Sequence, residues 1–424
     1  MKFLIFCVVI FLGFPASAGT QETTRERVFT LEESIQLALK NNPQVLLARE
    51  ELRRTTAMVM EARSGALPRL SAEAAYIRLD RLNMDSHRAN LRLIQPLYAG
   101  GMIRGTIQAA ELHHQAMEEG LHTVEAEITF RVKKGFYGIL LAQELVAVRA
   151  EALNLLQSHY QTTKERFNKG EVPRFDLLRA EIEVINASSE LIQVRSQLQS
   201  VENLFKNLLD LDLDSSFSLE GSLEYLPLQP DLNEALLKAL EQRSEIRQLR
   251  LVSKMREKNI DVARSGHRPL ISLFGNYEGL EGLPPTPDWD WNWNAGIMIE
   301  VPIFDGLMTR GRVGQARSEH EKSLLGLKDF KDRVRFEVRQ AFLDLEKARE
   351  IIEFQLKNVQ QAEENLKIVR ERHRKGISTH LEVMGVHLAL TKARTGYARA
   401  LYEHLIGKAS LERATGGRYR GSRE

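Results

Sequence analysis

The chain has 424 residues, a formal net charge of +2 and a single cysteine. A nearly neutral charge indicates neither a nucleic-acid partner nor acidic substrates, and one cysteine excludes a disulfide framework within the chain. The length would suggest two or three domains, but an internal repeat changes that interpretation.

The first 18 residues have the pattern of a secretory signal peptide. Lys2 supplies the positive end, residues 3–14 the apolar run, and 16–18 a small-residue cleavage site. We expect the mature chain to begin near Gly19, although a retained membrane anchor would show a similar pattern. Cleavage would remove Cys7 and leave a mature chain without thiols.

The rest of the chain is one unit written twice. Residues 29–35 resemble 230–236 at an offset of 201 (30 to 231). After five inserted residues the offset becomes 206, and Pro-Leu-Tyr-Ala-Gly at 96–100 resembles Pro-Ile-Phe-Asp-Gly at 302–306. Offsets that hold in order along the chain predict two tandem repeats. We place them at 19–220 and 221–416, followed by a polar tail at 417–424.

Each repeat opens with a signal for the start of a helix. Thr30 and Glu33 have the spacing of a capping box, and Asp231 and Glu234 share it. Asn42-Pro43 is typical of a helix that begins again, with Asn as the cap and Pro at the first helical position.

Short alternating segments follow, and the clearest is 289–301. Trp289, Trp291 and Trp293 share one face with the alternate apolar residues that follow them. A period of two predicts a strand with one apolar face. Three tryptophans at one end are typical of the aromatic girdle at a membrane interface. A half-buried strand of a soluble sandwich is the alternative, but it explains the tryptophans less well.

Three more strands are expected at about 70–79, 89–97 and 270–278, which gives two hairpins. Their connections, 80–87 and 279–288, are polar or proline-rich and suit exposed turns. No stretch after the signal peptide approaches eighteen consecutive apolar residues, so no spanning helix is expected. Any insertion into a membrane would use the strands.

The remaining sequence predicts long helices. Each repeat is expected to hold a long helix, a glycine break and a return helix: 102–169, Gly170 and 175–209 in the first repeat, and 308–375, Gly376 and 381–414 in the second. A helix over 102–169 would be about 100 Å long at 1.5 Å per residue.

Four strands cannot close a barrel, because small closed barrels need about eight. An open sheet edge is not tolerated in lipid, where its N–H and C=O groups would stay unpaired. Other copies of the chain must therefore complete the sheet. The expected fold class is mainly α with a transmembrane β-barrel portion: a β-barrel shared by several copies and continued by an α-helical barrel.

Several short motifs resemble the outer-membrane efflux protein family (TolC-like). They are Thr-Leu-Glu-Glu at 30–33, Asn-Asn-Pro at 41–43, Pro-Leu-Tyr-x-Gly-Gly at 96–101 and Glu-Arg-Phe-x-x-Gly at 165–170. Their duplicated order carries the resemblance, which covers about 29–416. It implies a homotrimer with four strands per chain and a belt of short helices around its waist.

The resemblance also implies a function and partners. The chain is expected to be the outer-membrane channel of a tripartite efflux pump or a type I secretion system, embedded in outer-membrane lipid and extending into the periplasm. It would be a passive export conduit, gated at its periplasmic tip. Its partners would be a periplasmic adaptor protein and an inner-membrane transporter, which decides the cargo. A periplasmic structural or adaptor protein and a periplasmic enzyme are the rival interpretations.

In the family, the turns between the long helices form the periplasmic tip and dock the adaptor. The residues of these turns are Gly170, Glu171, Val172, Gly376, Ile377 and Ser378. Asp176 and Glu382 match family acids that line the tip constriction, where threefold rings of like charge would attract cations. Arg174 is a candidate for a bond that holds the tip shut. The alternative for both acids is a favourable position at a helix N-terminus.

No other pattern indicates strong chemistry. His373, His380 and His387 recur every seven residues, which would suit a metal-export site, but Gly376 interrupts the helix and exposed histidines are the simpler interpretation. No catalytic triad or convincing metal-ligand cluster is present. We therefore expect no cofactor, no metal and no enzymatic activity.

Overall fold

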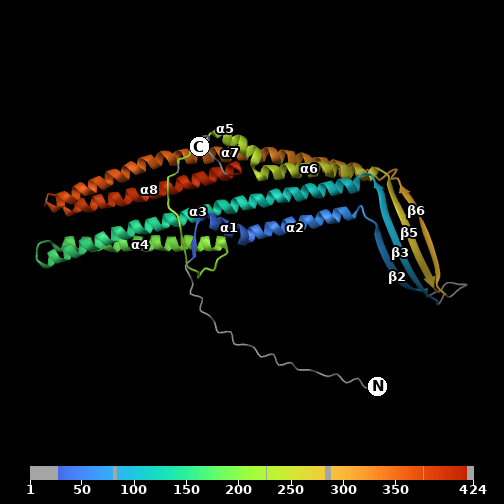
Figure 1. Cartoon of the computed structure of the whole chain (residues 1–424), viewed down its shortest axis with the longest axis horizontal. Coiled ribbons are helices and arrows are strands. Elements are labelled where there is room, and N and C mark those ends of the chain that lie inside the picture. The colour runs from blue at the N-terminus through green and yellow to red at the C-terminus, as the bar shows by residue number, and fades with distance from the viewer. Residues whose placement is uncertain (1–26, 80–83, 226, 282–287, 376, 418–424) are drawn as a thin grey trace, which may run out of the picture.

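A computed structural model describes residues 27–79, 84–225, 227–281, 288–375 and 377–417 (Figure 1). The expected signal peptide, Gly376 and all but the first residue of the expected tail lie outside these ranges.

The first repeat contains a short strand, two helices, a hairpin and two long helices. They are β1 (Arg27–Phe29), α1 (Leu31–Asn41), α2 (Pro43–Ser64), β2 (Arg69–Leu79), β3 (Met84–Ala99), α3 (Met102–Asn168) and α4 (Arg174–Leu209). The first repeat ends with a short strand, β4 (Phe217–Leu219). The second repeat has the same order of helices and long strands as the first. They are α5 (Leu232–Gln242), α6 (Ser244–Arg264), a 3₁₀ turn (Ser265–His267), β5 (Leu270–Glu281), β6 (Asp290–Glu300), α7 (Met308–Arg374) and α8 (His380–Thr415).

The predicted helix starts are present. The backbone N–H of Glu33 donates to the Thr30 hydroxyl over 3.3 Å, and the Glu33 carboxylate accepts from the Thr30 backbone N–H over 2.9 Å. The Asn42 side chain caps α2, which has Pro43 in its first turn. The Asp231 carboxylate accepts from two backbone N–H groups at the start of α5.

The long strands form one antiparallel sheet in the order β2-β3-β5-β6. The β3–β5 ladder joins the two repeats. Ala72 lies opposite Leu91 in the first hairpin, and Leu273 lies opposite Ile297 in the second. These pairs are related by the same offsets of 201 and 206 that the sequence shows. The hairpins are thus equivalent in register, and β2 and β6 form the two edges of the sheet.

All four long strands differ in length from the expectation, although β2 differs only by starting at Arg69 rather than 70. β3 begins at Met84 rather than 89 and ends at Ala99 rather than 97, and β5 continues to Glu281 rather than 278. β6 covers 290–300 rather than 289–301. Polar pairs extend the ladders beyond the apolar alternation: the Tyr76 hydroxyl donates to Asp85 over 2.9 Å, and His87 lies 3.1 Å from Glu281. Residues 84–87 and 279–281, which were expected to lie in turns, are therefore strand.

The helices pack side by side in two tiers between the sheet and the distant turns (Figure 1). Beside the sheet, the packing order is α2-α3-α6-α7. In the half with the long turns, the order is α4-α3-α8-α7. Each repeat has its own core. The fully buried residues of these cores include Val132, Phe136 and Phe205 in the first repeat and Val338, Leu345 and Leu411 in the second.

A second, small sheet was not predicted. β1 pairs in parallel with β4, and Phe29 packs against Phe217 with ring centroids 6.2 Å apart. This contact brings the start of the first repeat to the connection between the repeats. Within the described ranges, no helix is both long and apolar enough to cross a bilayer.

Candidate functional site

The turns between the long helices close in the same way in both repeats. Gly170 has a φ of +74°, a conformation that glycine adopts without steric cost. The N–H of Glu171 donates to the carbonyl of Arg166 over 2.9 Å, and the N–H of Ile377 donates to that of Arg372 over 2.9 Å. This is the six-residue closure of a Schellman motif. Gly376 itself lies outside the described residues.

The two return helices start differently. In α8, the Thr379 hydroxyl accepts from the Glu382 N–H over 3.3 Å, and the Glu382 carboxylate accepts from the Thr379 N–H over 3.3 Å. In α4, Pro173 occupies the cap position and makes no side-chain hydrogen bond to the helix. The Glu382 carboxylate is therefore bound to its own helix, whereas α4 has no such capping box to hold Asp176.

The other predicted tip residues lie in different surroundings. Arg174 and Asp176 are both exposed, and no ion pair joins them within the described chain. Glu171 accepts from the Arg166 guanidinium over 3.2 Å. Val172 lines the cavity described next, Ile377 is exposed and Ser378 is buried. The gating and docking roles of these residues stay predictions.

A cavity of about 320 Å³ lies where the two helical hairpins approach each other near their turns. All four long helices contribute to its lining, with His159 from α3, Asp176 from α4, His373 from α7 and Met384 from α8. Burial lowers the pKa of His159, and the positive charge of nearby His373 adds to that effect.

Two of the three histidines of the heptad spacing, His373 and His387, make separate contacts. His373 Nδ1 donates to the carbonyl of Ser378 over 2.9 Å, and Arg370 donates to His387 Nε2 over 2.9 Å. The side chain of His380 lies outside the described part of the chain. Among the described residues, no group of three or more His, Cys, Asp or Glu side chains is placed to hold a metal ion.

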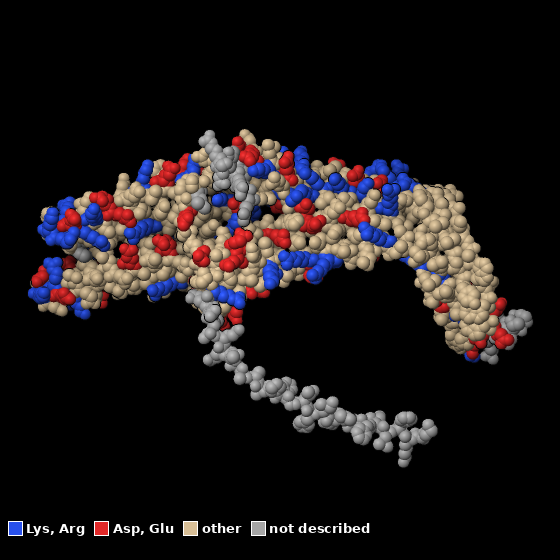
Figure 2. Space-filling view, in the orientation of Figure 1, with Lys and Arg blue, Asp and Glu red and all other residues tan. Residues whose placement is uncertain are grey.

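The predicted tryptophan girdle lies at the end of the sheet farther from the helices. Trp289 and Trp291 stack with centroids 5.3 Å apart, and Tyr277 stacks on Trp291 at 5.0 Å. Gly279 leaves room for these rings, because a Cβ there would lie 2.8 Å from Trp291. All three tryptophans are exposed. Figure 2 shows that the sheet bears few charged side chains on the visible face, except at its far end.

The order of elements and their duplication can be compared with known proteins. The sequence profile described as "Outer membrane efflux protein" matches residues 34–209 and 235–417. These ranges include most of the chain and parts of both repeats. The chain belongs to the outer membrane efflux protein family.

Individual relatives of this efflux protein are distant in sequence. The outer membrane efflux protein BepC of Brucella suis is 22% identical over 392 residues, which is 91% of this chain and 85% of BepC. The outer membrane protein TolC of Vibrio cholerae is 22% identical, covering 91% of this chain and 90% of TolC. The crystal structure of the Campylobacter jejuni CmeC outer membrane channel aligns with a TM-score of 0.82 at 18% identity, over 97% and 95% of the two chains.

These findings confirm the predicted fold, function class and location. The efflux protein is an outer-membrane export channel whose helices extend into the periplasm. The relatives do not test the roles of single residues at the tip or in the girdle.

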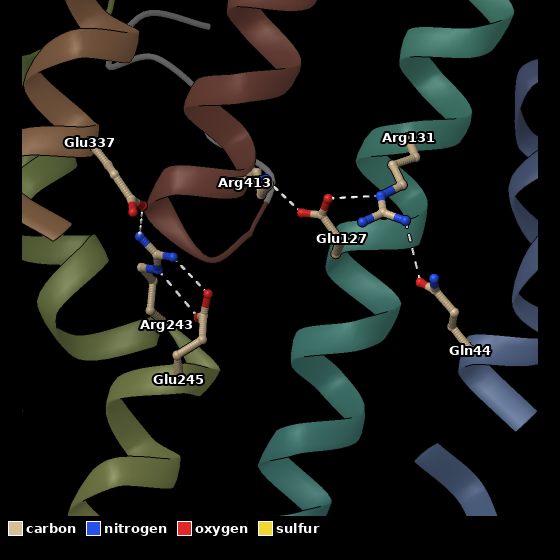
Figure 3. Close-up of polar contacts among 7 residues, drawn as sticks. All are labelled: Gln44, Glu127, Arg131, Arg243, Glu245, Glu337 and Arg413. Carbon is tan, nitrogen blue, oxygen red and sulfur yellow. Dashed lines mark hydrogen bonds and ion pairs between the residues drawn. The ribbon is translucent and has the colours of Figure 1, made fainter. Parts of the chain in front are cut away.

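A network of ion pairs at the waist of the efflux protein was missed by the sequence reasoning (Figure 3). Glu127 on α3 accepts from Arg131 over 2.9 Å and from Arg413 on α8 over 2.5 Å. Lys133 on α3 also pairs with Glu412 on α8. The network thus ties the first repeat to the second, beside a cavity of about 360 Å³. The residues that pair across the repeats, such as Glu127 and Arg413, lie 286 positions apart in the sequence. No local sequence motif therefore indicates these pairs.

A separate group of ion pairs lies at the corner between α5 and α6 (Figure 3). Arg243 is only 4% exposed and binds the Glu245 carboxylate through two nitrogens, over 2.6 and 3.2 Å. It also donates to Glu337 of α7 over 2.5 Å, and it lies over the Phe330 ring. Partial burial of the Glu245 carboxyl would raise its pKa, but the hydrogen bonds and charge of Arg243 outweigh this and lower it.

Proposed function

We propose that three copies of the chain form a closed tube that conducts cargo passively from a periplasmic adaptor protein and an inner-membrane transporter to the exterior. The observation that carries this proposal is the position of the unpartnered edges. The sheet ends in β2 and β6, the helical tier beside it ends in α2 and α7, and the distal tier ends in α4 and α7. The first repeat thus supplies one edge of every tier and the second repeat supplies the other.

This arrangement favours a head-to-tail ring. A twofold dimer would join an edge to its own copy, whereas a rotational ring joins the first-repeat edge of one copy to the second-repeat edge of the next. Two copies would supply eight strands, and barrels of that size are filled by side chains or hold one small ligand. Three copies of the four-stranded sheet supply twelve strands, which supports a wider, water-filled passage.

The distal edges carry apolar side chains that nothing in the single chain covers. On α4 they follow a spacing of three and four residues, the spacing of a helix–helix seam. These exposed residues are Phe175, Leu178, Ile182, Ile185 and Ile192. On the distal part of α7 the exposed large apolar residues include Phe336, Leu343 and Phe354. Packing of α4 against α7 of the next copy would remove both stripes from water.

The repeat also predicts the register between neighbouring copies. Within the chain, Leu91 of β3 lies opposite Tyr277 of β5. Applying the offsets, Ile297 of β6 is equivalent to Leu91, and Tyr76 of β2 is equivalent to Tyr277. If the copies pair as the repeats do, Ile297 of one copy lies opposite Tyr76 of the next. Residues opposite each other in an antiparallel ladder have Cα atoms about 4.5–5.5 Å apart, which suits a disulfide.

Cysteine crosslinking tests this seam. The only native cysteine, Cys7, lies in the expected signal peptide, so the double variant Tyr76→Cys/Ile297→Cys would carry the only two thiols of the mature protein. Oxidation in isolated outer membranes should give a covalent trimer on a non-reducing gel. The matched control, Ala72→Cys/Ile297→Cys, places the thiols four residues out of register and should stay monomeric. Covalent dimers without trimers, or equal crosslinking of the control, would refute the head-to-tail ring.

Two further measurements separate the channel from the rival adaptor and enzyme interpretations. Purified protein in planar bilayers should give discrete conductance steps. The chain has three tryptophans, all within 289–293, so its intrinsic fluorescence reports on one end of β6. Brominated lipids should quench it most strongly when the bromine lies near the headgroups. A protein without conductance and without quenching would not be a membrane channel.

A further inference from the structure

The α7–α8 turn carries more positive charge than its equivalent in the other repeat. Residues 366–375 contain five Lys or Arg side chains and one acid, whereas the equivalent 160–169 contain three and one. Figure 2 shows the end of the α7–α8 hairpin mostly blue and the end of the α3–α4 hairpin mixed blue and red. Because the backbone closes both turns in the same way, the turn itself does not require the additional cations.

These cations are exposed and weakly compensated within the chain. Arg374 lies 3.7 Å from Glu371, and the two side chains are 76% and 56% exposed. Exposed pairs of this kind contribute little. Neither Arg372 nor Lys375 has an ion-pair partner among the residues that the structure describes, and both are exposed. Glu382, the next acid along the chain, is bound to the start of its own helix.

The cluster also acts against the stability of its helix. Arg370 and Arg374 are four residues apart on α7, a spacing at which like charges destabilise a helix by about 0.2–0.5 kcal/mol. The negative end of the helix dipole offsets part of this repulsion. However, the C-terminus of α3 closes in the same way and carries fewer cations, so the helix dipole does not account for the additional cations of α7. The difference between the turns is therefore better explained by something that binds the second turn.

We propose that the α7–α8 turn docks acidic side chains of a periplasmic partner protein, and that the α3–α4 turn contributes little electrostatic attraction to the same partner. This inference rests on the proposed function, which places both turns at the periplasmic end of the tube. Around a ring of three copies the two kinds of turn alternate, so the partner needs acidic groups at three positions rather than around the whole rim.

An anionic membrane surface fits the pattern less well. A lipid surface is continuous and would meet both kinds of turn at once. The α3–α4 turn presents the exposed acids Glu171 and Asp176 close to its cations, and these would be repelled by anionic headgroups. A protein can place its acids opposite the basic turns alone, so the observations favour a protein partner.

The test uses two triple variants of the full-length mature channel in lipid nanodiscs, matched in the number of charges that they remove. Variant A is Arg372→Gln/Arg374→Gln/Lys375→Gln. Variant B is Lys164→Gln/Arg166→Gln/Lys169→Gln, which removes the same number of charges from the equivalent stretch of the other repeat. The probe is a fluorescein-labelled hexaglutamate peptide, with binding followed by fluorescence anisotropy at low and moderate salt. Vesicles rich in phosphatidylglycerol form a second arm.

We expect variant A to bind hexaglutamate about tenfold more weakly than the wild type, because three exposed charge contacts contribute about 0.5 kcal/mol each. Variant B should lose less than about threefold, and added salt should weaken wild-type binding towards that of variant A. Equal losses in A and B, or no binding by the wild type, would overturn the inference. Vesicle binding that is as sensitive to variant A as peptide binding would assign the turn to lipid instead.

Conductance separates this result from a failure of the proposed function. Both variants change only exposed side chains and should form channels with the wild-type frequency of insertion. If the wild type conducts but does not bind hexaglutamate, the docking inference alone fails. If the wild type forms no channel, the proposed function fails as well.

Discussion

Substitution of Arg243 by Met tests how much the corner between α5 and α6 depends on one buried cation. Methionine keeps most of the volume and removes the charge. The change leaves Glu245 and Glu337 beside each other without their shared partner, and it removes the contact with Phe330. Removal of one partner from a buried ion pair costs about 3–5 kcal/mol. The Glu245 and Glu337 side chains are 28% and 42% exposed, so water screens part of the effect. We therefore expect Arg243→Met to lower the free energy of unfolding by about 3 kcal/mol.

The assay is guanidinium unfolding of the detergent-solubilised channel, followed by far-UV circular dichroism at pH 7. The control is Arg53→Met, which removes an exposed arginine that pairs with Glu50 within one helix turn and should cost less than about 1 kcal/mol. The triple variant Arg243→Met/Glu245→Gln/Glu337→Gln should recover part of the loss, because no carboxylate is then left unpaired. A loss for Arg243→Met no larger than that of Arg53→Met would refute the reasoning.

Three further changes have expected outcomes. Gly279→Val places a side chain against the stacked indoles. It should lower the free energy of unfolding by about 1–3 kcal/mol and shift the tryptophan emission. Unchanged emission would contradict the packing described. Thr379→Ala removes the α8 cap and should cost about 1 kcal/mol in the same unfolding assay, while Ser200→Ala on the exposed face of α4 should be close to neutral. The pKa of His387 is lowered from 6.5 to about 4, first by burial and then by Arg370. The folded state therefore resists protonation, so the contribution of His387 is complete above pH 6.5 and is lost as the pH falls towards 4. Because the ring is partly exposed, the effect is reduced. We expect the free energy of unfolding of the wild type to fall by about 1 kcal/mol more than that of His387→Gln between pH 7 and pH 4.5; equal falls would exclude the effect.

The sequence predicted the large elements well because their signals are local. Proline-free stretches with apolar residues every three or four positions strongly favour helices, and the bounds of α3 and α7 differ from the expectation by one residue each. The strands were less well predicted. Their apolar alternation marks the part that faces an apolar environment, but cross-strand polar pairs such as His87–Glu281 extend the ladder further, and such pairs are visible only once the register is known.

The break between α5 and α6 shows a second limit. Asn42 and Arg243 occupy equivalent positions in the two repeats, and both are buried at the corner between two helices. Asn42 precedes a proline and was recognised from that pattern. Arg243 has no such neighbour, and its role depends on Glu337, which lies 94 residues away. The same limit applies at the tip, where the capping box of Glu382 was not distinguished from a pore-lining role.

The equivalence of the two hairpins has an evolutionary consequence. The β3–β5 ladder joins two halves that are alike in register, as two separate subunits would be. A chain of half this length would contain one hairpin and one set of helices, and six such chains would build the same ring. Two halves joined in one chain can differ in sequence. A ring of three chains can therefore present two different kinds of surface that alternate around it.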